Sequence, residues 1–347
     1  MHFLQQLEAL VAFHLEEHTR GRHLLQFLEE EDDIAHQAVP SVKGGKRSAF
    51  FEAIHSTGLE QLSLVFKTLQ AEAARIIPKE NRDLGDLTAI DQFYTKSVFS
   101  KQWADFSNIA RNAAGYVSFD LNRSIPTGIA LIPNKVDARP YVNDLFVPAQ
   151  TAVMDPNYQS YKDFDSWIAE GKHFICRIRA NSQLSLLENN GLPESSSVFY
   201  DAAVLLGIPN VNQTRNPVRV IGYREKLKEF WIATSRNDLE AEQVASAYKA
   251  RWAIEKFFEW WNIHLKYYQA IARSGYGLAV QTLAGLVTYL LLAIYSYEHF
   301  GERVSIKKVS HFRIQIRDEL LAKRIEHIVS MSEANAGTQA KLQESPI

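Results

Sequence analysis

Two short apolar runs that end in an acid decide how this sequence folds: Asp86-Leu-Thr-Ala-Ile-Asp91 and Thr151-Ala-Val-Met-Asp155. Runs of this length, bounded by turn residues and rich in apolar or β-branched side chains, predict buried strands. Similar runs lie at 114–120, 126–133 and 173–179. A helical pattern at Phe164–Glu170 precedes the last of them. Strands mixed with helices predict an α/β fold, with a mixed sheet and flanking helices.

The rest of the chain divides into further regions by its pattern of apolar, polar and turn residues. Before the first strand, apolar residues recur at helical spacing and predict an all-helical N-terminal region. Between 181 and 246, turn residues separate strand patterns, which predicts a β-rich insertion. The expected division is 1–82 helical, with possible binding of DNA ends; 83–180 first part of the α/β core; 181–246 β-rich insertion; 247–330 helical second part of the core; and 331–347 disordered tail.

Within the β-rich region, Val218–Tyr223 and Glu229–Ala233 have strand patterns, and Arg224–Lys228 between them predicts a hairpin turn. Ser235 followed three positions later by Asp238 predicts the start of the next helix, because a hydroxyl there accepts a bond from the first turn.

That helix carries a third acid, Glu255, in a stretch of mixed chemistry. At 100° per residue, Tyr248, Arg251, Glu255 and Lys266 fall within a sector of about 60°. A phenol, a guanidinium, a carboxylate and an ammonium group would then share one stripe. The alternative is a row of exposed ion pairs, each contributing a few tenths of a kcal/mol. Two carboxylates from strand ends and one from a helix are the oxygen ligands that paired Mg²⁺ ions need over a phosphodiester.

These residues also carry a family resemblance. The run Tyr248-x-x-Arg251-Trp-x-Ile-Glu255-x-Phe-Phe-x-Trp260 resembles the Y-R-E-K motif helix of bacterial insertion-sequence DDE transposases, specifically the insertion sequence four group. Asp155-Pro-Asn-Tyr158, followed by Gly171-Lys-His-Phe-Ile-Cys-Arg177, is similar to the second-aspartate block of that family. Asp91 stands where the first aspartate belongs. The resemblance covers about residues 45–300.

The resemblance implies an RNase H-like core in which Asp91, Asp155 and Glu255 bind two Mg²⁺ ions, with Mn²⁺ as a substitute. It implies a transposase: an enzyme that cleaves the ends of an insertion sequence in double-stranded DNA and joins them to target DNA. Tyr248 and Arg251 would hold DNA phosphates beside the scissile bond. Cleavage and joining of two ends imply a homodimer in the synaptic complex.

Three positions need separate expectations. Trp231 or Phe230 matches the place where related enzymes stack an extruded base, and packing in the core is the alternative for either ring. Asn262 stands at the usual Lys of the motif, and Lys266, one turn further along, is the candidate substitute. Asn157 replaces a usual Gly, and we expect it to tolerate a left-handed backbone there.

Composition sets limits on partners and location. The net charge of −2 gives no overall attraction to DNA, although residues 248–324 hold 12 basic and 6 acidic side chains. The single cysteine, Cys176, excludes an internal disulfide, and no secretion signal pattern follows Met1, which together predict a cytoplasmic protein. The apolar stretch Leu278–Tyr295 is interpreted as a buried core helix rather than a membrane span, and we expect no membrane and no small-molecule substrate.

Two alternatives remain for the function. An inactive transposase-derived protein would bind DNA without cleaving it, and Asn262 is the feature that keeps this alternative open. A zinc protease is the other, because His14-Leu-Glu-Glu-His18 fits the pattern H-x-x-E-H. That pattern needs a further ligand downstream, and a polar helix face is the simpler interpretation.

Overall fold

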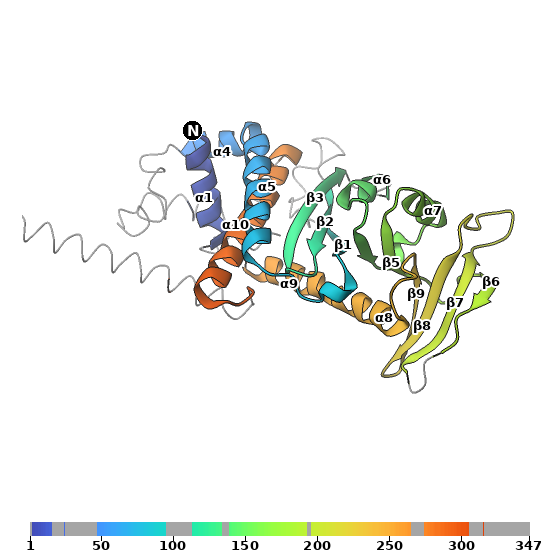
Figure 1. The fold of residues 1–347 in the computed structure, drawn as a ribbon. Helices are drawn as coiled ribbons and strands as arrows, with labels where there is room; N and C mark the ends of the chain where they lie inside the picture. Colours follow the sequence, from blue (N-terminus) through green and yellow to red (C-terminus); the bar gives the residue numbers. More distant parts are fainter. Residues whose placement is uncertain are drawn as a thin grey trace, which may run out of the picture.

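The computed structural model describes residues 2–15, 24, 47–94, 113–133, 139–192, 196–264, 274–304 and 315. Within these ranges the chain forms one large mixed sheet with helices on both of its faces and a cluster of helices at one end (Figure 1). The α/β class and the large mixed sheet expected from the sequence are confirmed.

The strands are β1 (Leu87–Tyr94), β2 (Ala113–Asp120), β3 (Ile125–Pro133), β4 (Thr151–Met154), β5 (His173–Arg177), β6 (Leu184–Asn189), β7 (Val198–Leu206), β8 (Val218–Glu225) and β9 (Lys228–Thr234). The α-helices are α1 (Phe3–Leu15), α4 (Arg47–Ser56), α5 (Leu59–Ile76), α6 (Arg139–Val142), α7 (Tyr161–Ala169), α8 (Ala241–Ala250), α9 (Trp252–His264) and α10 (Gly275–Phe300). Short 3₁₀ turns are η2 (Arg82–Leu84), η4 (Asn143–Leu145) and η5 (Pro156–Tyr158).

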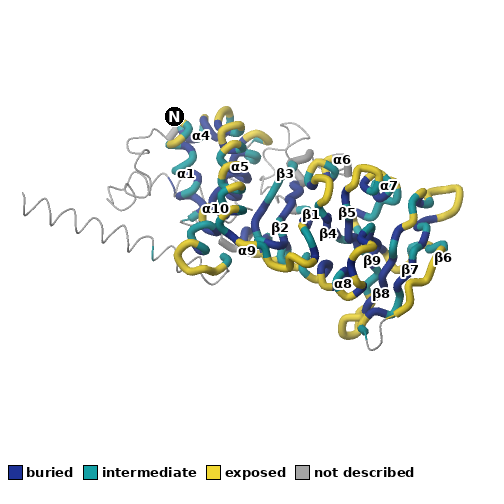
Figure 2. The backbone as a smooth tube through the Cα atoms, in the orientation of Figure 1, coloured by how far each residue is buried: buried dark blue, intermediate teal, exposed yellow. Residues whose placement is uncertain are grey.

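The nine strands run in the order β3-β2-β1-β4-β5-β9-β8-β7-β6. Strands β1, β4 and β5 are parallel neighbours, and all other pairs are antiparallel. Since β5 pairs with β9, the four strands of the region 181–246 continue the same sheet rather than forming a separate one. Strand β6 forms the edge, and it is partly or fully exposed along its length (Figure 2).

The predicted hairpin is confirmed, because β8 and β9 pair from Arg219 opposite Thr234 down to Glu225 opposite Lys228. Lys226 has φ +55° in the two-residue turn, a conformation typical of tight hairpins. The predicted helix start at Ser235 is wrong: α8 begins at Ala241, and Glu240 and Gln243 form its capping box. The Ser235 hydroxyl instead accepts a hydrogen bond from the backbone N–H of Phe174 at 3.2 Å, so it fastens the end of β9 to β5.

The sheet separates two hydrophobic cores, because successive side chains of a strand point to opposite faces. On the first face, Ala89, Val153 and Ile175 pack with α8, α9 and α10. On the second face, buried residues such as Met154 pack with Phe164 of α7. We call these the first core and the second core. The alternation identifies the face of every side chain on β1, β4, β5 and β9.

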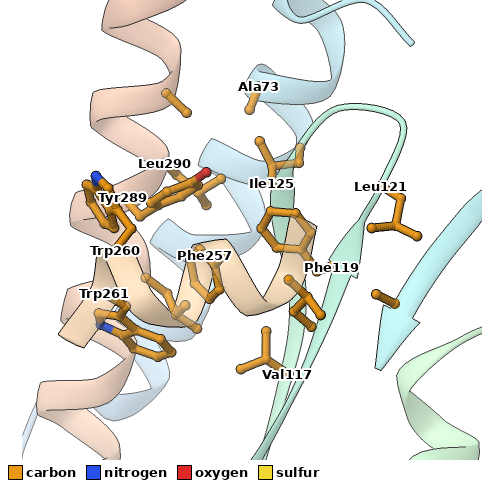
Figure 3. Close-up of a cluster of buried hydrophobic side chains, with 14 of the residues drawn as sticks. Ala73, Val117, Phe119, Leu121, Ile125, Phe257, Trp260, Trp261, Tyr289 and Leu290 are labelled. Atoms are coloured by element: carbon orange, nitrogen blue, oxygen red, sulfur yellow. The ribbon is translucent and has the colours of Figure 1, made fainter. Parts of the chain in front are cut away.

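Helix α10 lies among α1, α4 and α5 at the β3 end of the sheet (Figure 1). In Figure 3, Phe257, Trp260 and Trp261 of α9 pack between α10 and strand β2, which carries Val117 and Phe119. The Trp261 side chain reaches α10 at Gly285, where a Cβ atom would lie 2.9 Å from the indole nitrogen. The absence of a side chain at Gly285 therefore leaves room for the Trp261 ring.

By length and composition alone, α10 could cross a membrane, and it is the one described helix of which this is true. Of its most apolar 18-residue window, 78% is buried inside the structure. Its burial agrees with the interpretation of this stretch as a core helix.

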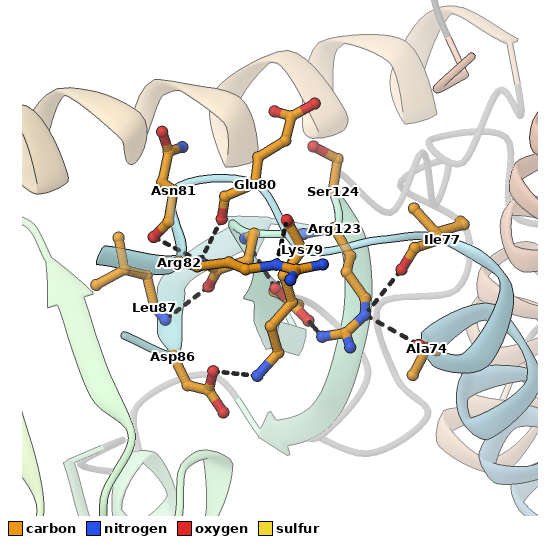
Figure 4. Close-up of polar contacts among 12 residues, drawn as sticks. Ala74, Ile77, Lys79, Glu80, Asn81, Arg82, Asp86, Leu87, Arg123 and Ser124 are labelled. Atoms are coloured by element: carbon orange, nitrogen blue, oxygen red, sulfur yellow. Dashed lines mark hydrogen bonds and ion pairs between the residues drawn. The ribbon is translucent and has the colours of Figure 1, made fainter. Parts of the chain in front are cut away.

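A polar cluster fastens the chain just before β1. The buried Asn122 side chain accepts from the backbone N–H of Leu87 at 2.8 Å and donates to the carbonyl oxygens of Glu80 (2.8 Å) and Gly85 (3.0 Å). Beside it, Arg123 donates to the carbonyl oxygens of Ala74 and Ile77 at the end of α5 (Figure 4). These bonds fix where β1 begins relative to the N-terminal helices.

Candidate active site

The first two acids lie side by side at the carboxyl ends of neighbouring parallel strands. In the β1–β4 register, Leu87 is opposite Thr151 and Ala89 is opposite Val153. Two residues further along, the same register puts Asp91 opposite Asp155. Ala89 and Val153 face the first core, and so, by alternation, do the two carboxyl groups. The spacing of 64 residues in sequence becomes adjacency in the sheet.

Asp155 caps the short turn η5 that follows β4. Its Oδ1 accepts from the Asn157 backbone N–H at 2.8 Å, and its Oδ2 accepts from the Asn157 side-chain amide at 3.0 Å. The turn after Asp155 forms with Asn157 inside it, and the expected tolerance of a left-handed backbone is not needed, because Asn157 is absent from the residues with positive φ. The Asn side chain has another role than tolerance of a turn: it holds the carboxylate of Asp155.

Arg251 occupies a tightened turn between α8 and α9, which the expectation of one continuous helix missed. The backbone N–H of Arg251 donates to the Tyr248 carbonyl oxygen at 3.1 Å, and that of Ile254 donates to the Arg251 carbonyl oxygen at 3.0 Å. Both are i to i+3 bonds, which wind the chain more tightly than an α-helix. The 100° spacing therefore does not hold through this point, although Tyr248, Arg251 and Glu255 still gather at one place.

The Arg251 guanidinium joins the strand acid to the helix acid. Its Nη1 donates to Asp91 Oδ2 at 3.2 Å, and its Nη2 donates to Glu255 Oε1. Its Cζ lies 5.7 Å from the centroid of the Tyr248 ring. The side chains of Arg251, Asp91 and Glu255 are 12%, 19% and 35% exposed, so the cluster opens to solvent on the side of Glu255.

The electrostatics of the cluster act most clearly on Asp91. The pKa of Asp91 is raised to about 6, chiefly by burial and to a smaller extent by repulsion from Asp155 and Glu255. A hydrogen bond from the Gln92 backbone N–H, at 2.8 Å, and the charge of Arg251 oppose this rise. One guanidinium therefore does not offset the burial of this carboxyl group beside two other acids.

An aromatic and cationic group extends from this cluster along the first-core face. Arg177, at the end of β5, lies over the Phe230 ring with its Cζ 4.8 Å from the centroid. Phe230 lies 6.4 Å from Tyr248 and stacks on Tyr223 at 5.1 Å. Sequence reasoning missed Arg177 as a site residue, although its position two residues after Ile175 on the same face was a usable signal.

Trp231 is not brought to this cluster. Strand alternation turns it to the second core, where its ring contacts Phe199 at 5.3 Å and Tyr200 at 5.2 Å. Of the two aromatic candidates for base stacking, only Phe230 lies on the same face as Tyr248 and Arg251. Trp231 has the packing role that was its alternative.

The remaining sequence candidates are only partly covered. Asn262 lies in α9, but its side chain is not described, and Lys266 and His18 lie outside the described residues. His14 is buried in α1, with its Nε2 3.3 Å from the Gln281 carbonyl oxygen of α10. This position packs His14 between two helices.

In the described ranges, no three His, Cys, Asp or Glu side chains are arranged to hold a metal ion. At Asp91, Asp155 and Glu255, two of the three carboxylates are bonded to Arg251 instead. The donor set itself suits Mg²⁺ or Mn²⁺, which prefer carboxylate oxygens, and the pKa of Asp91 is raised chiefly by burial and in part by the charges of the other two acids. The residues fit a divalent cation in kind, provided that Arg251 moves.

Comparison with known protein families decides the relationship. The sequence profile described as "Transposase DDE domain" matches residues 117–291, half of the chain. The chain belongs to the DDE transposase family. The matched segment includes Asp155, Arg251 and Glu255 and begins after Asp91. The resemblance to insertion-sequence transposases drawn from the motifs is confirmed.

Relatives named as transposases agree with this. The transposase of insertion sequence element IS5377 from Geobacillus stearothermophilus is 24% identical over 61% of this chain and 57% of its own length. The protein named as transposase y4zB from Sinorhizobium fredii (strain NBRC 101917 / NGR234) is 23% identical over 55% of this chain and 56% of its own. The chain thus spans little more than half the length of these relatives.

Similarity to solved structures is much weaker. Endonuclease V from Streptomyces avermitilis aligns at 13% identity with a TM-score of 0.25, covering 55% of this chain and 82% of that one. A TM-score this low does not show a shared fold.

Proposed function

We propose that this transposase cleaves DNA at the ends of an insertion sequence and joins the freed ends to target DNA, with Asp91, Asp155 and Glu255 as the catalytic acids. The observation that carries the proposal is the register of β1 and β4, which sets two acids side by side, with Glu255 tied to the first of them through Arg251. The order β3-β2-β1-β4-β5 of this part of the sheet supports an RNase H-like core.

The three acids would hold the divalent cations. When bound, two such ions activate the attacking oxygen and stabilise the leaving oxygen of an in-line displacement. Asn157 keeps Asp155 in one orientation through two hydrogen bonds, so one ligand is fixed before any cation arrives. The same acids serve cleavage by water and attack by the freed 3′ hydroxyl on target DNA, because both are displacements at phosphorus that need no energy cofactor.

Cationic and aromatic groups beside the acids would position the DNA. Arg251 and Arg177 can each bind a phosphate through two parallel hydrogen bonds. Phe230, on the same face, offers a ring for an unstacked base, and Tyr248 offers a phenol near the scissile phosphate. The N-terminal helices α1, α4 and α5 remain candidates for recognition of the element ends, and synapsis of two ends implies a homodimer.

The test is strand cleavage of duplex DNA that carries the terminal repeats flanking the gene, in Mg²⁺ or Mn²⁺. Asp91→Asn, Asp155→Asn and Glu255→Gln keep the size of each side chain and should abolish nicking. Glu259→Gln, an exposed acid one turn further along α9, is the matched control and should cleave like the parent. Equal cleavage by all four variants would reject this site. Tight binding of the terminal repeats without nicking by the parent would favour an inactive, DNA-binding descendant of a transposase.

A further inference from the structure

Arg251 is held differently from the other arginines that lie largely buried in the described ranges. Arg219 donates from Nε to Asp201 Oδ1 at 2.9 Å and from Nη1 to the Leu239 carbonyl oxygen at 2.6 Å. Arg236 donates from Nε to Asp238 Oδ1 and from Nη1 to the Leu84 carbonyl oxygen. Each is anchored by a carboxylate and by the backbone, as expected of a structural guanidinium.

The guanidinium of Arg251 has carboxylate partners but, among the described residues, no bond to a backbone carbonyl oxygen. Its two ion pairs are with Asp91 and Glu255, and its Nε is buried with no hydrogen-bond partner. An unpartnered buried N–H costs about 1–3 kcal/mol, so the position is not optimised for a permanent bond network. What holds Arg251 in place is the negative charge of two acids to which the proposed function assigns another ligand.

A divalent cation held by these carboxylates would lie beside the guanidinium that now bonds them, and the two positive charges would repel each other. We propose that Arg251 is the counter-ion of the cation-free site, and that it exchanges with the divalent cation: it leaves Asp91 and Glu255 when the cation binds, and its guanidinium becomes available to a DNA phosphate. The inference rests on the proposed function, because it takes the cation and the phosphate from that reaction.

This exchange couples two binding events. The cation must displace two ion pairs, which weakens its binding to the protein alone. A phosphate that receives the released guanidinium recovers that free energy, so cation and DNA each strengthen the binding of the other by the same factor. The exchange would keep the acids partly neutralised, and less able to capture metal, until DNA is present.

The first experiment measures Mn²⁺ binding to the full chain without DNA, by electron paramagnetic resonance. Arg251→Gln should bind Mn²⁺ about tenfold more tightly than the parent, a typical size for coupling between two ligands. Arg177→Gln is the matched control, because it removes the same charge from the same face but from a residue that lies over Phe230 rather than on the acids. Equal affinities in the parent and Arg251→Gln, or equal tightening by Arg177→Gln, would overturn the exchange.

The second experiment uses heat. In EDTA, Arg251→Gln should melt below the parent, since it leaves three acids without their counter-ion. Saturating Mn²⁺ should raise its melting temperature more than it raises that of the parent or of Arg177→Gln. The same rise in all three proteins would show that Arg251 does not compete with the cation.

The third measurement adds a 20-base-pair duplex of arbitrary sequence. Mn²⁺ affinity should rise on adding the duplex by about tenfold in the parent and clearly less in Arg251→Gln. If Arg251→Gln does not fold by circular dichroism, Arg251→Lys replaces it: Lys keeps the charge but cannot bridge both acids, so it should show intermediate Mn²⁺ affinity. If the duplex raises the Mn²⁺ affinity of Arg251→Gln, or of Arg251→Lys in its place, as much as it raises that of the parent, the exchange is overturned.

Failure of the exchange and failure of the proposed function have different signatures. If Asp91→Asn, Asp155→Asn and Glu255→Gln abolish Mn²⁺ binding while Arg251→Gln has no effect, the cation site stands and the exchange falls. If none of the three acid substitutions changes Mn²⁺ binding, the proposed cation site itself falls.

Discussion

The two ends of the β1–β4 strand pair differ in how their polar groups are bonded. At the amino ends, Asn122 satisfies three backbone groups, and Arg236 donates to the Leu84 carbonyl oxygen and the Thr151 hydroxyl while paired with Asp238. At the carboxyl ends, Asp91 lies beside Asp155, and the pKa of Asp91 is raised, chiefly by burial and in part by repulsion from Asp155 and Glu255. The polar groups at the amino ends are bonded within the protein. Under the proposed function, the acids at the carboxyl ends need a cation from outside the protein.

This contrast indicates that different residues determine stability and the proposed activity. A fully bonded polar cluster rigidifies the amino ends of β1 and β4. The two acids, four residues further along each strand, can therefore be held together in spite of their repulsion. Substitutions at the amino ends should therefore lower stability, and substitutions at the carboxyl ends should lower activity with little loss of stability.

The largest expected effect is on cleavage at the carboxyl ends. Glu255→Gln should lower the rate of Mg²⁺-dependent nicking by roughly 10³- to 10⁴-fold, as loss of a residue acting within a catalytic unit does. Its urea midpoint should stay close to that of the parent, because the side chain is partly exposed and keeps its size. Parallel losses of nicking and of stability would mean that the two ends are not separated in this way.

At the amino ends, Asn122→Ala should lower the free energy of unfolding by about 4 kcal/mol, because it leaves the Leu87 N–H and two carbonyl oxygens without their buried partner. Urea unfolding followed by circular dichroism measures this. Arg82→Ala, an exposed side chain in the same loop, is the control and should cost much less. A small effect of Asn122→Ala would remove the basis for calling this end structural.

The raised pKa of Asp91 predicts a pH dependence in EDTA. In the folded chain its pKa is about 6, against 3.8 for an ordinary Asp, so the folded state binds this proton more tightly than the unfolded state does. Asp91 therefore lowers the free energy of unfolding as pH rises from about 4 through about 6, by up to about 3 kcal/mol, and no further above that.

Asp91→Asn removes this titration. Relative to the parent, the variant should gain about 3 kcal/mol of stability between pH 4 and pH 7, measured as the change in the difference between the two unfolding free energies. Comparing differences cancels the titration of all other groups. Parallel pH profiles for the two proteins would show that the pKa of Asp91 is not raised in the folded chain.

The smallest expected effect is at Asn157. Asn157→Ala removes the side-chain bond to Asp155 Oδ2 but keeps the backbone N–H bond to Oδ1. Nicking should fall about tenfold, the lower range for partners that orient a metal ligand. Asn157→Gly, the usual residue of the family at this position, is the informative comparison: full activity there would show that the amide is not needed to orient Asp155.

Much of this arrangement follows from local sequence. The strands before Asp91 and Asp155 and the hairpin of β8 and β9 are predictable, because apolar runs and turn residues are local signals. Adjacency of the two acids also follows once the strands are parallel neighbours, since the carboxyl ends of parallel strands meet at one edge.

Other features depend on contacts between distant segments. The turn at Arg251 is not visible in a helical pattern, because residues on both sides of it have good helix propensity. The local pattern misplaces the start of α8 because Ser235 bonds to Phe174 of β5, which is 61 residues away in the chain. The choice between Phe230 and Trp231 depended on the register of β9, and a shift of one residue exchanges the two faces.

Gly285, thirty residues beyond Glu255, bears on the proposed site from a distance. Trp261, on the helix that carries Glu255, lies against the bare backbone of α10 at this position. A Cβ atom there would meet the indole ring, so either the ring or the helix that carries it must shift. Under the proposed function, a shift of α9 would move Glu255 relative to the two acids on the strands, and a single added methyl group on α10 would then alter how the three acids hold a cation.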